Sequence, residues 1–280
     1  MRGDKIKSYA KVNLSLSVLK KLKNNYHRIE SIASFISLHD LIKIKRINEH
    51  QNKIIFHGRF SKNIPKKNTV SNLLNILEKE NFLKSKYFIK IEKKIPQKSG
   101  LGGGSSNASS LLNYFIKKNK IKLTESEIVK IANKIGSDVA LGLKKKNSII
   151  LSNGKIIRLN SKFNFYTLII KPKFGCSTKL IYKNVKNYSK PFFSKNTRIK
   201  KLNILVNQRN DLEKVAFKHY PNLKKIKKTM ENLSNVFFVR MSGSGSSIVA
   251  YFSSKKASLI ALKILKKKYK NYWCILSKTI

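Results

Sequence analysis

The amino-acid sequence predicts an α+β protein of two domains. Its 280 residues, 41% of them hydrophobic, suffice for a sizeable core in one large or two ordinary domains. The first half combines strand-like stretches with a glycine-rich turn and amphipathic helices. The second half, from about residue 163, has the order β-α-β-β-α-β, which is typical of the split βαβ arrangement. We therefore predict domains over residues 1–158 and 159–280.

Alternating patterns predict the strands of the first half. Every second residue from Val12 to Val18 is apolar, so Lys11 and Asn13 share the opposite, polar face of a strand over residues 8–18. Further strands are predicted over residues 31–36, 40–45, 53–57 and 87–93.

A period of 3.6 residues predicts the helices of the first half, over residues 70–80, after the glycine-rich turn, and from Thr124 onward. Thr124 and Glu127 can form a capping box, and Gly136 is placed to end that last helix. In the second half we expect strands over residues 166–171, 236–240, 248–252 and 272–276, and helices over residues 178–186, 199–206, 211–234 and 255–269. The polar segment 184–197 is predicted to be a flexible loop.

The net charge of +48, from 61 Lys and Arg against 13 Asp and Glu, raises the question of nucleic-acid binding. Of these cations 53 are lysines, and they are spread along the chain rather than gathered in one stripe. A nucleic-acid reader would favour clustered arginine. We therefore interpret the charge as a bias toward A/T-rich codons and expect no specific nucleic-acid partner. The alternative, a nucleic-acid-binding protein, predicts an affinity that falls steeply with salt.

Other classes of protein are disfavoured by features that the sequence lacks. No apolar run approaches the roughly 18 residues that span a bilayer, and the N-terminus lacks the apolar core of a signal peptide. The two cysteines, Cys176 and Cys274, offer neither a disulfide framework nor zinc-ligand spacing. We expect a cytoplasmic monomer or weak homodimer with no membrane partner and no cluster of metal-ligating residues.

The strongest signal for function is a glycine-rich loop that leads into a helix. Consecutive glycines let backbone N–H groups approach an anion, and a helix N-terminus favours phosphate. The loop is neither a Walker A motif nor a dinucleotide fingerprint, and a mere tight connection is the alternative. We expect phosphate binding by the loop residues Pro96, Gln97, Lys98, Ser99, Gly100, Leu101, Gly102, Gly103, Gly104, Ser105 and Ser106.

Two further signals are weaker when each is taken alone. The Ser/Gly-rich segment 240–247 joins two predicted strands, and a flexible hairpin is its simpler interpretation. Lys11 and Asp138 suit phosphoryl transfer to an alcohol, because a cation keeps a carboxylate ionised and the carboxylate can orient or accept the hydroxyl proton. The simpler interpretations are a solvated lysine on a strand and an aspartate that caps a helix.

Five segments, taken in their order along the chain, resemble the GHMP small-molecule kinases. They are Ala10–Leu14, Tyr26-His27, Pro96–Ala108, Gly136–Val139 and Met241–Gly245. The resemblance runs from about residue 8 to the C-terminus. It implies the two-domain GHMP kinase architecture, with an N-terminal ribosomal-S5-like α/β domain and a C-terminal ferredoxin-like domain.

The third loop glycine and the Tyr-His pair are similar to the branch of this superfamily that acts on a cytidine-diphosphate-linked methylerythritol. That likeness implies an ATP-dependent kinase, with Mg²⁺, which phosphorylates the 2-hydroxyl of this small molecule on the non-mevalonate route to isoprenoid precursors. A kinase of the homoserine or mevalonate type is the alternative. Four residues depart from the family pattern: Asn24-Asn25 replaces Asp-Gly, Ala140 replaces a proline, and Lys155 stands where a glutamate often follows glycine.

The resemblance also implies roles for single residues. Asp138 would be the base or orienting carboxylate, Lys11 its cationic partner, and Asn13 would touch the methylerythritol end of the substrate. At the other end, cytosine would stack between two tyrosines and hydrogen-bond to a histidine, and one asparagine would lie near the adenine of ATP. These residues are Tyr26, Tyr182, His27 and Asn68 respectively.

Overall fold

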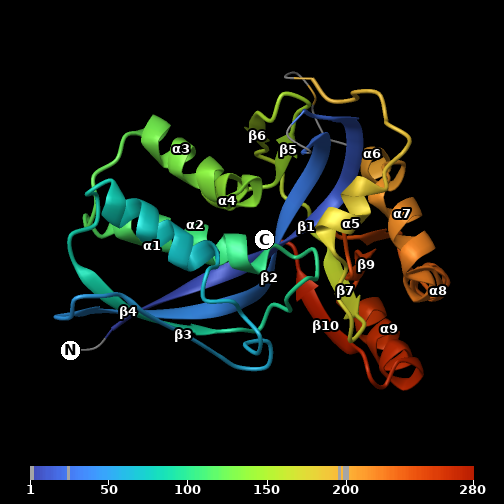
Figure 1. The fold of residues 1–280 in the computed structure, drawn as a ribbon. Helices are drawn as coiled ribbons and strands as arrows, with labels where there is room; N and C mark the ends of the chain where they lie inside the picture. Colours follow the sequence, from blue (N-terminus) through green and yellow to red (C-terminus); the bar gives the residue numbers. More distant parts are fainter. Residues whose placement is uncertain (1–2, 24–25, 195–196, 198–201) are drawn as a thin grey trace. The chain divides into compact units, whose positions relative to one another are not determined.

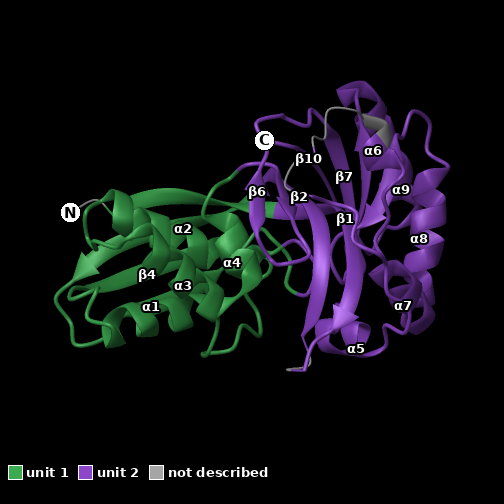
Figure 2. Cartoon of the chain, turned by 90° about the horizontal axis from the view of Figure 1, so that it is seen from above, with its two compact units in different colours: residues 1–10, 38–97, 102–145 green, residues 11–37, 98–101, 146–280 purple. Residues whose placement is uncertain are grey.

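The computed structural model describes residues 3–23, 26–194, 197 and 202–280, and its contacts divide the chain into two compact units (Figure 2). Unit 1 comprises Met1–Ala10, Leu38–Gln97 and Gly102–Lys145. Unit 2 comprises Lys11–Ser37, Lys98–Leu101 and Lys146–Ile280. The units are therefore interleaved along the sequence. The domain boundary between residues 158 and 159 stays a prediction.

The elements confirm the α+β class. Two long strands, β1 (Asp4–Lys21) and β2 (His27–Ile47), have residues in both units. The other elements of unit 1 are β3 (Lys53–His57), α1 (Thr69–Lys79), β4 (Lys86–Glu92), α2 (Gly103–Lys117), α3 (Glu125–Ile135) and α4 (Ser137–Gly142) (Figure 1). The remaining elements are β5 (Ser148–Ile150), β6 (Ile156–Arg158), β7 (Tyr166–Lys171), α5 (Thr178–Lys183), α6 (Leu202–Val206), α7 (Leu212–His219), α8 (Pro221–Glu231), β8 (Phe238–Met241), β9 (Ile248–Phe252), α9 (Lys255–Lys268) and β10 (Trp273–Lys278).

Unit 1 is a layer of helices on one face of a small sheet (Figure 1). The C-terminal part of β2 pairs antiparallel with β4, and β3 pairs parallel with β4. Leu73 and Leu77 of α1 and Leu111 and Phe115 of α2 are completely buried, as their 3.6-residue spacing predicted. The ring of Tyr87 on β4 lies 5.0 Å from that of Phe115, so α2 is fixed against the sheet.

Unit 2 contains a four-stranded antiparallel sheet in the order β10-β7-β9-β8. The first and third strands of the β-α-β-β-α-β chain order, β7 and β9, are thus central, and the fourth and second, β10 and β8, are the edges, which is the ferredoxin-like arrangement predicted above. Helices α8 and α9 pack on this sheet through Ile226 and Leu265, against Leu168 and Ile248. The N-terminal part of β2 pairs with β5, and β5 with β6.

The structure corrects several predicted boundaries. The strands expected at 31–36 and 40–45 are parts of the single strand β2. The helix expected over 211–234 is two helices, because Pro221 lacks the N–H that a helix interior requires and instead begins α8. The short elements β5, β6 and α4 were not predicted, because three to six residues carry too little periodicity. Residues 198–201 and Asn24-Asn25 lie outside the described residues.

The segment predicted as a loop, residues 184–197, contains neither helix nor strand where the structure describes it. It is nevertheless anchored within unit 2. The Ser189 N–H donates to the carbonyl of Val18 at 2.8 Å, and the Phe192 N–H donates to Oε2 of Glu30 at 2.7 Å. Among the described helices, none combines the length and apolar character needed to cross a membrane.

Candidate active site

A cavity of about 260 Å³ in unit 1 adjoins the N-terminus of α2. Apolar side chains, among them Phe56, Val70 and Ile95, form much of its wall. Five residues predicted from the sequence also line it: Asn68, Pro96, Gln97, Gly103 and Gly104. An apolar pocket with a few polar groups beside a helix N-terminus fits a nucleotide with its base in the pocket and its phosphates at the helix.

The glycines of the loop are required by their conformation and by close packing. Gly102 is the N-cap of α2 with a left-handed φ of 67°, and no side chain caps the helix there. The first N–H groups of α2 therefore have no partner within the helix. A Cβ on Gly103 would lie 2.9 Å from Cγ2 of Ile95, so no larger residue fits without displacing the cavity wall. This cradle fits a phosphate group.

Asn68 forms a structural part of the cavity wall. Its Oδ1 accepts from the N–H groups of Val70 and Ser71, and its Nδ2 donates to the carbonyls of Pro65 and Lys66. Both ends of the amide are thus engaged in starting α1. On the next residue, Oγ1 of Thr69 donates to the carbonyl of Gly104 at 2.7 Å, which ties α1 to the glycine-rich loop.

Gln97 ties the start of the glycine-rich loop to the segment 60–62. Its Nε2 donates to the carbonyls of Phe60 and Lys62 at 3.0 and 2.7 Å. Lys98 is exposed with φ of 47°, whereas Ser99 and Ser106 are buried. Sequence reasoning missed Lys93, which also lines the cavity, because one lysine among 53 carries no signal.

A polar cluster in unit 2 contains Lys11 and Asn13. The Lys11 ammonium donates to Oδ1 of Asn13 at 2.7 Å, so the shared strand face is confirmed. Lys11 is only 6% exposed, which shows that the solvated-lysine alternative is wrong. The Nδ2 of Asn13 donates to Ser31 Oγ at 2.8 Å, and its N–H donates to Ser242 Oγ at 3.3 Å. A buried lysine on a strand is rigidly placed and can stabilise negative charge.

The Ser/Gly-rich turn after β8 packs on the first part of the glycine-rich loop. Ser242 Oγ donates to the carbonyl of Gly100 at 2.9 Å, and the Ser247 N–H donates to the carbonyl of Ser99 at 3.1 Å. The Nδ2 of Asn210 donates to the carbonyls of Met241 and Gly243 and so anchors both the end of β8 and the turn. The segment does join two antiparallel strands, as the hairpin interpretation expected, and these hydrogen bonds anchor it on the glycine-rich loop.

Asp138 stands in the first turn of α4, half-buried, in unit 1. The N-cap of this helix is Gly136, so the alternative that Asp138 caps a helix is wrong. Gly142, at the other end of α4, allows a close approach to α2, because a Cβ there would overlap Oγ of Ser109. Packing of α4 on α2 thus fixes the position of the short helix that carries Asp138.

The residues predicted to bind cytosine lie in unit 2. The His27 ring lies 5.1 Å from the ring of Tyr182, at an interplanar angle of 37°. Tyr182, on α5, is half-buried against the core, whereas Tyr26 is 73% exposed. A cluster of two rings with a third exposed ring nearby in the sequence can offer stacking surfaces to a base.

Burial lowers the pKa of His27 below its usual value, and the positive charge of Lys21 lowers it further. The unfolded chain therefore takes up this proton at a higher pH than the folded chain does, so the free energy of unfolding falls as the pH drops through and below 6.5. We expect the His27→Gln variant to lose less stability than the wild type between pH 7 and 5.5. Denaturant unfolding at both pH values measures this, and equal losses would contradict it.

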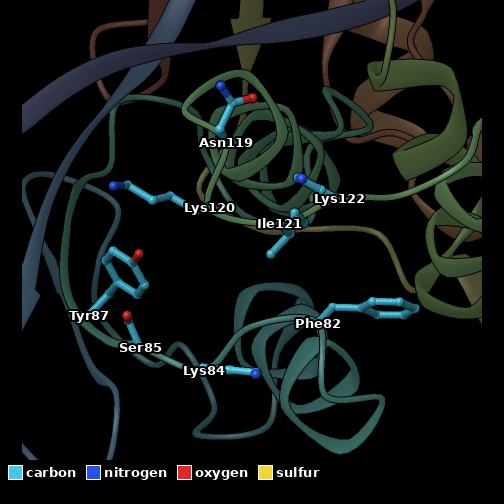
Figure 3. A pocket seen from close by; sticks show the side chains of 8 residues that line it. All are labelled: Phe82, Lys84, Ser85, Tyr87, Asn119, Lys120, Ile121 and Lys122. Atoms are coloured by element: carbon cyan, nitrogen blue, oxygen red, sulfur yellow. The ribbon is translucent and has the colours of Figure 1, made fainter.

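A second cavity in unit 1, of about 320 Å³, lies between the segments 82–87 and 119–122 (Figure 3). Although this cavity is the larger of the two, none of the catalytic or binding residues predicted from the sequence lines it. Ile121 points into it, and Lys84, Lys120 and Lys122 surround it. We therefore place the candidate active site at the smaller cavity, beside the glycine-rich loop. Among the described residues, no three His, Cys, Asp or Glu side chains gather as metal ligands do.

Comparison with known families defines the class of protein. The family model described as GHMP kinases N terminal domain matches residues 68–145, and that described as GHMP kinases C terminal matches residues 193–271. These matches include the glycine-rich loop, Asp138, Asn210 and the Ser/Gly-rich turn. Fold and site thus define a GHMP kinase.

Comparison with curated relatives identifies the family within the GHMP kinases to which the chain belongs. The 4-diphosphocytidyl-2-C-methyl-D-erythritol kinase of Pelagibacter ubique (strain HTCC1062) is 55% identical over 100% of both chains. The relative of the same name from Caldicellulosiruptor bescii is 33% identical over 94% of both chains. The chain belongs to the 4-diphosphocytidyl-2-C-methyl-D-erythritol kinase family.

Solved structures confirm the predicted GHMP kinase fold. A 4-(cytidine 5'-diphospho)-2C-methyl-D-erythritol kinase superposes with a TM-score of 0.78 at 23% identity, covering 98% of this chain and 99% of the other. Homoserine kinase from Cytophaga hutchinsonii superposes with a TM-score of 0.71 at 18% identity, covering 99% and 95%. At these identities the likeness concerns the fold alone.

Proposed function

We propose that this kinase transfers the γ-phosphoryl group of ATP to the 2-hydroxyl of 4-diphosphocytidyl-2-C-methyl-D-erythritol, using the residues described above. The observation that carries the proposal is the cavity at the N-terminus of α2, where part of the glycine-rich loop lies beside an apolar wall. The 55% identity to a relative of that name supports the choice of substrate.

ATP would be held by this chain at two kinds of surface. The apolar wall, including Phe56, Val70 and Ile95, would take the base, and the N–H groups at the start of α2 would take the phosphates. Bound ATP would supply the γ-phosphoryl group, and ADP would be the leaving group. A Mg²⁺ ion accompanies such phosphates in most kinases, and the hydroxyls of Ser105 and Ser106 are the candidate protein oxygens for its shell.

In phosphoryl transfer the protein forms no covalent bond to the substrate, so catalysis depends mainly on positioning the reactants and stabilising the charge of the transition state. Asp138 would orient the acceptor hydroxyl and accept or direct its proton. Lys11, held by its hydrogen bond to Asn13, would stabilise the negative charge that develops. Asn13 would also offer its amide to the methylerythritol end of the substrate.

Recognition of cytosine would come from Tyr26, His27 and Tyr182. Replacing Tyr182 by alanine removes a stacking surface that typically contributes about 1–3 kcal/mol per base. We expect the affinity for a cytidine diphosphate ligand to fall by about 5- to 150-fold, while Tyr182→Phe retains it and ATP affinity stays unchanged in both variants. Calorimetric titration checks this, and equal affinities for the alanine and phenylalanine variants would contradict it.

The direct test of the proposed function is phosphoryl transfer by the purified wild-type chain. With [γ-³²P]ATP and Mg²⁺, label is expected on the cytidine-diphosphate sugar alcohol and not on homoserine or mevalonate. Labelling of one of those two acids instead would favour the alternative kinase class.

The monomeric or weakly dimeric state and the lack of a specific nucleic-acid partner stay predictions. Sedimentation tests the first, and the salt dependence of RNA binding tests the second.

A further inference from the structure

We propose that Asp40 is a positioning residue, which holds Lys93 as a nucleotide-binding cation in the wall of the unit 1 cavity. The inference rests on the proposed function, because it concerns the site at which ATP would bind. Asp40 is completely buried and Lys93 is 4% exposed. The Lys93 ammonium donates to Oδ2 of Asp40 in a close ion pair.

Asp40 also fixes the backbone that leads into the glycine-rich loop. Its second oxygen, Oδ1, accepts from the N–H groups of Lys94 and Ile95 at 2.7 and 2.8 Å. One carboxylate therefore holds both the side chain of Lys93 and the two residues before Pro96. Three charge-assisted hydrogen bonds to a single buried carboxylate give a rigid junction between β4 and the loop.

The head group of Lys93 lies against the first turn of α2. Lys93 lines the cavity together with Gly103 and Gly104. A Cβ built on Gly103 would be 3.4 Å from Nζ of Lys93, so the ammonium, and not only the stem, is at the loop. Of the three N–H donors of this ammonium, only the one to Asp40 has a partner within the described part of the chain.

The stability of the folded protein does not by itself explain why a charged pair is buried here. Removing two charges from water costs several kcal/mol per ion, and apolar replacements of such pairs are often neutral or stabilising. Here the pair borders a cavity, and the ammonium retains donors for an acceptor atom. A nucleoside triphosphate brings both acceptors and negative charge, so it complements Lys93 as no apolar ligand would.

The test is the double variant Asp40→Asn/Lys93→Met. Asparagine keeps an oxygen for the two backbone N–H groups, and methionine keeps the length of the side chain without its charge. We expect the affinity for ATP to fall by about 10- to 100-fold and KM for ATP to rise likewise. Tm and the affinity for a cytidine diphosphate ligand are expected to stay at wild-type values.

A matched control is available at Lys86, the first residue of β4, whereas Lys93 directly follows the last. The variant Glu78→Gln/Lys86→Met makes the same change of charge in a pair that does not line the cavity, with Nζ to Oε1 at 2.5 Å. It is expected to bind ATP as the wild type does. The single variant Lys93→Met provides a second measurement, with lowered ATP affinity and unchanged cytidine-ligand affinity.

The outcomes separate this inference from the proposed function. Wild-type ATP affinity in a folded Asp40→Asn/Lys93→Met variant would overturn the inference, as would an equal loss in the Glu78→Gln/Lys86→Met control. A loss for ATP but not for adenosine places the acceptor on the phosphates, and a loss for both places it on the nucleoside; either result supports the inference. Failure of the wild type to bind ATP would instead count against the proposed function.

Discussion

The Asp138→Asn variant is expected to lower kcat by about 10²–10⁴-fold, the usual contribution of a positioned acid–base group. Asparagine has nearly the same shape but is a far weaker proton acceptor, so the acceptor hydroxyl loses its orientation and its route for the proton. KM for ATP should change little, because the nucleotide cavity is formed by other residues. Steady-state kinetics with both substrates varied measure the two effects separately.

A matched control for this variant is Glu125→Gln. Glu125 also occupies the first turn of a helix, α3, and its side chain is 84% exposed beside Lys144. The same change of charge there is expected to leave kcat within about twofold, as surface ion pairs contribute at most about 1 kcal/mol. Undiminished turnover by Asp138→Asn, or a similar loss in both variants, would rule out the assigned role.

Gly100→Ala is expected to destabilise the protein by about 2–4 kcal/mol. Gly100 has φ of 76°, and a Cβ there would overlap the carbonyl oxygen of Ser242. The substitution therefore combines left-handed backbone strain with a collision between the glycine-rich loop and the turn after β8. The free energy of unfolding from denaturant titration gives the measurement, and activity should fall at temperatures where the wild type is stable.

Gly154→Ala separates the two causes. Gly154 has φ of 82° but nothing within 4 Å of its would-be Cβ. Only the backbone cost applies, so we expect a loss of about 1–2 kcal/mol. If both alanine variants were equally destabilised, the contact between Gly100 and Ser242 would not constrain the fold.

Much of this fold could be predicted because its signals are local. Strands β3, β7 and β9 follow from short runs rich in apolar and aromatic residues, and the capping box of α3 follows from one Thr-x-x-Glu pattern. The glycine-rich loop was found for the same reason, since its chemistry lies in consecutive residues. Asn68 was predicted near the adenine, but its cap of α1 was not.

The features that escaped prediction depend on contacts between distant residues. Nothing adjacent to Asp40 or Lys93 in the sequence indicates that they pair. The burial of Lys11 follows from the elements packed around its strand, and a polar strand face by itself suggests solvent instead. Pro221 is the exception, a local signal within residues 211–234 that indicates a helix start rather than one continuous helix.

The interleaving of the two units has a consequence for how the chain acquires its structure. Unit 2 needs residues from the beginning and the end of the sequence: Ile36 bridges to Thr279, and Leu16 bridges to Asn210. Contacts between such distant residues slow folding, because the loop must be closed before the contact forms. Neither unit can be excised as one uninterrupted gene fragment, because each is assembled from three separate segments of the chain, so no single truncation leaves either unit whole and alone.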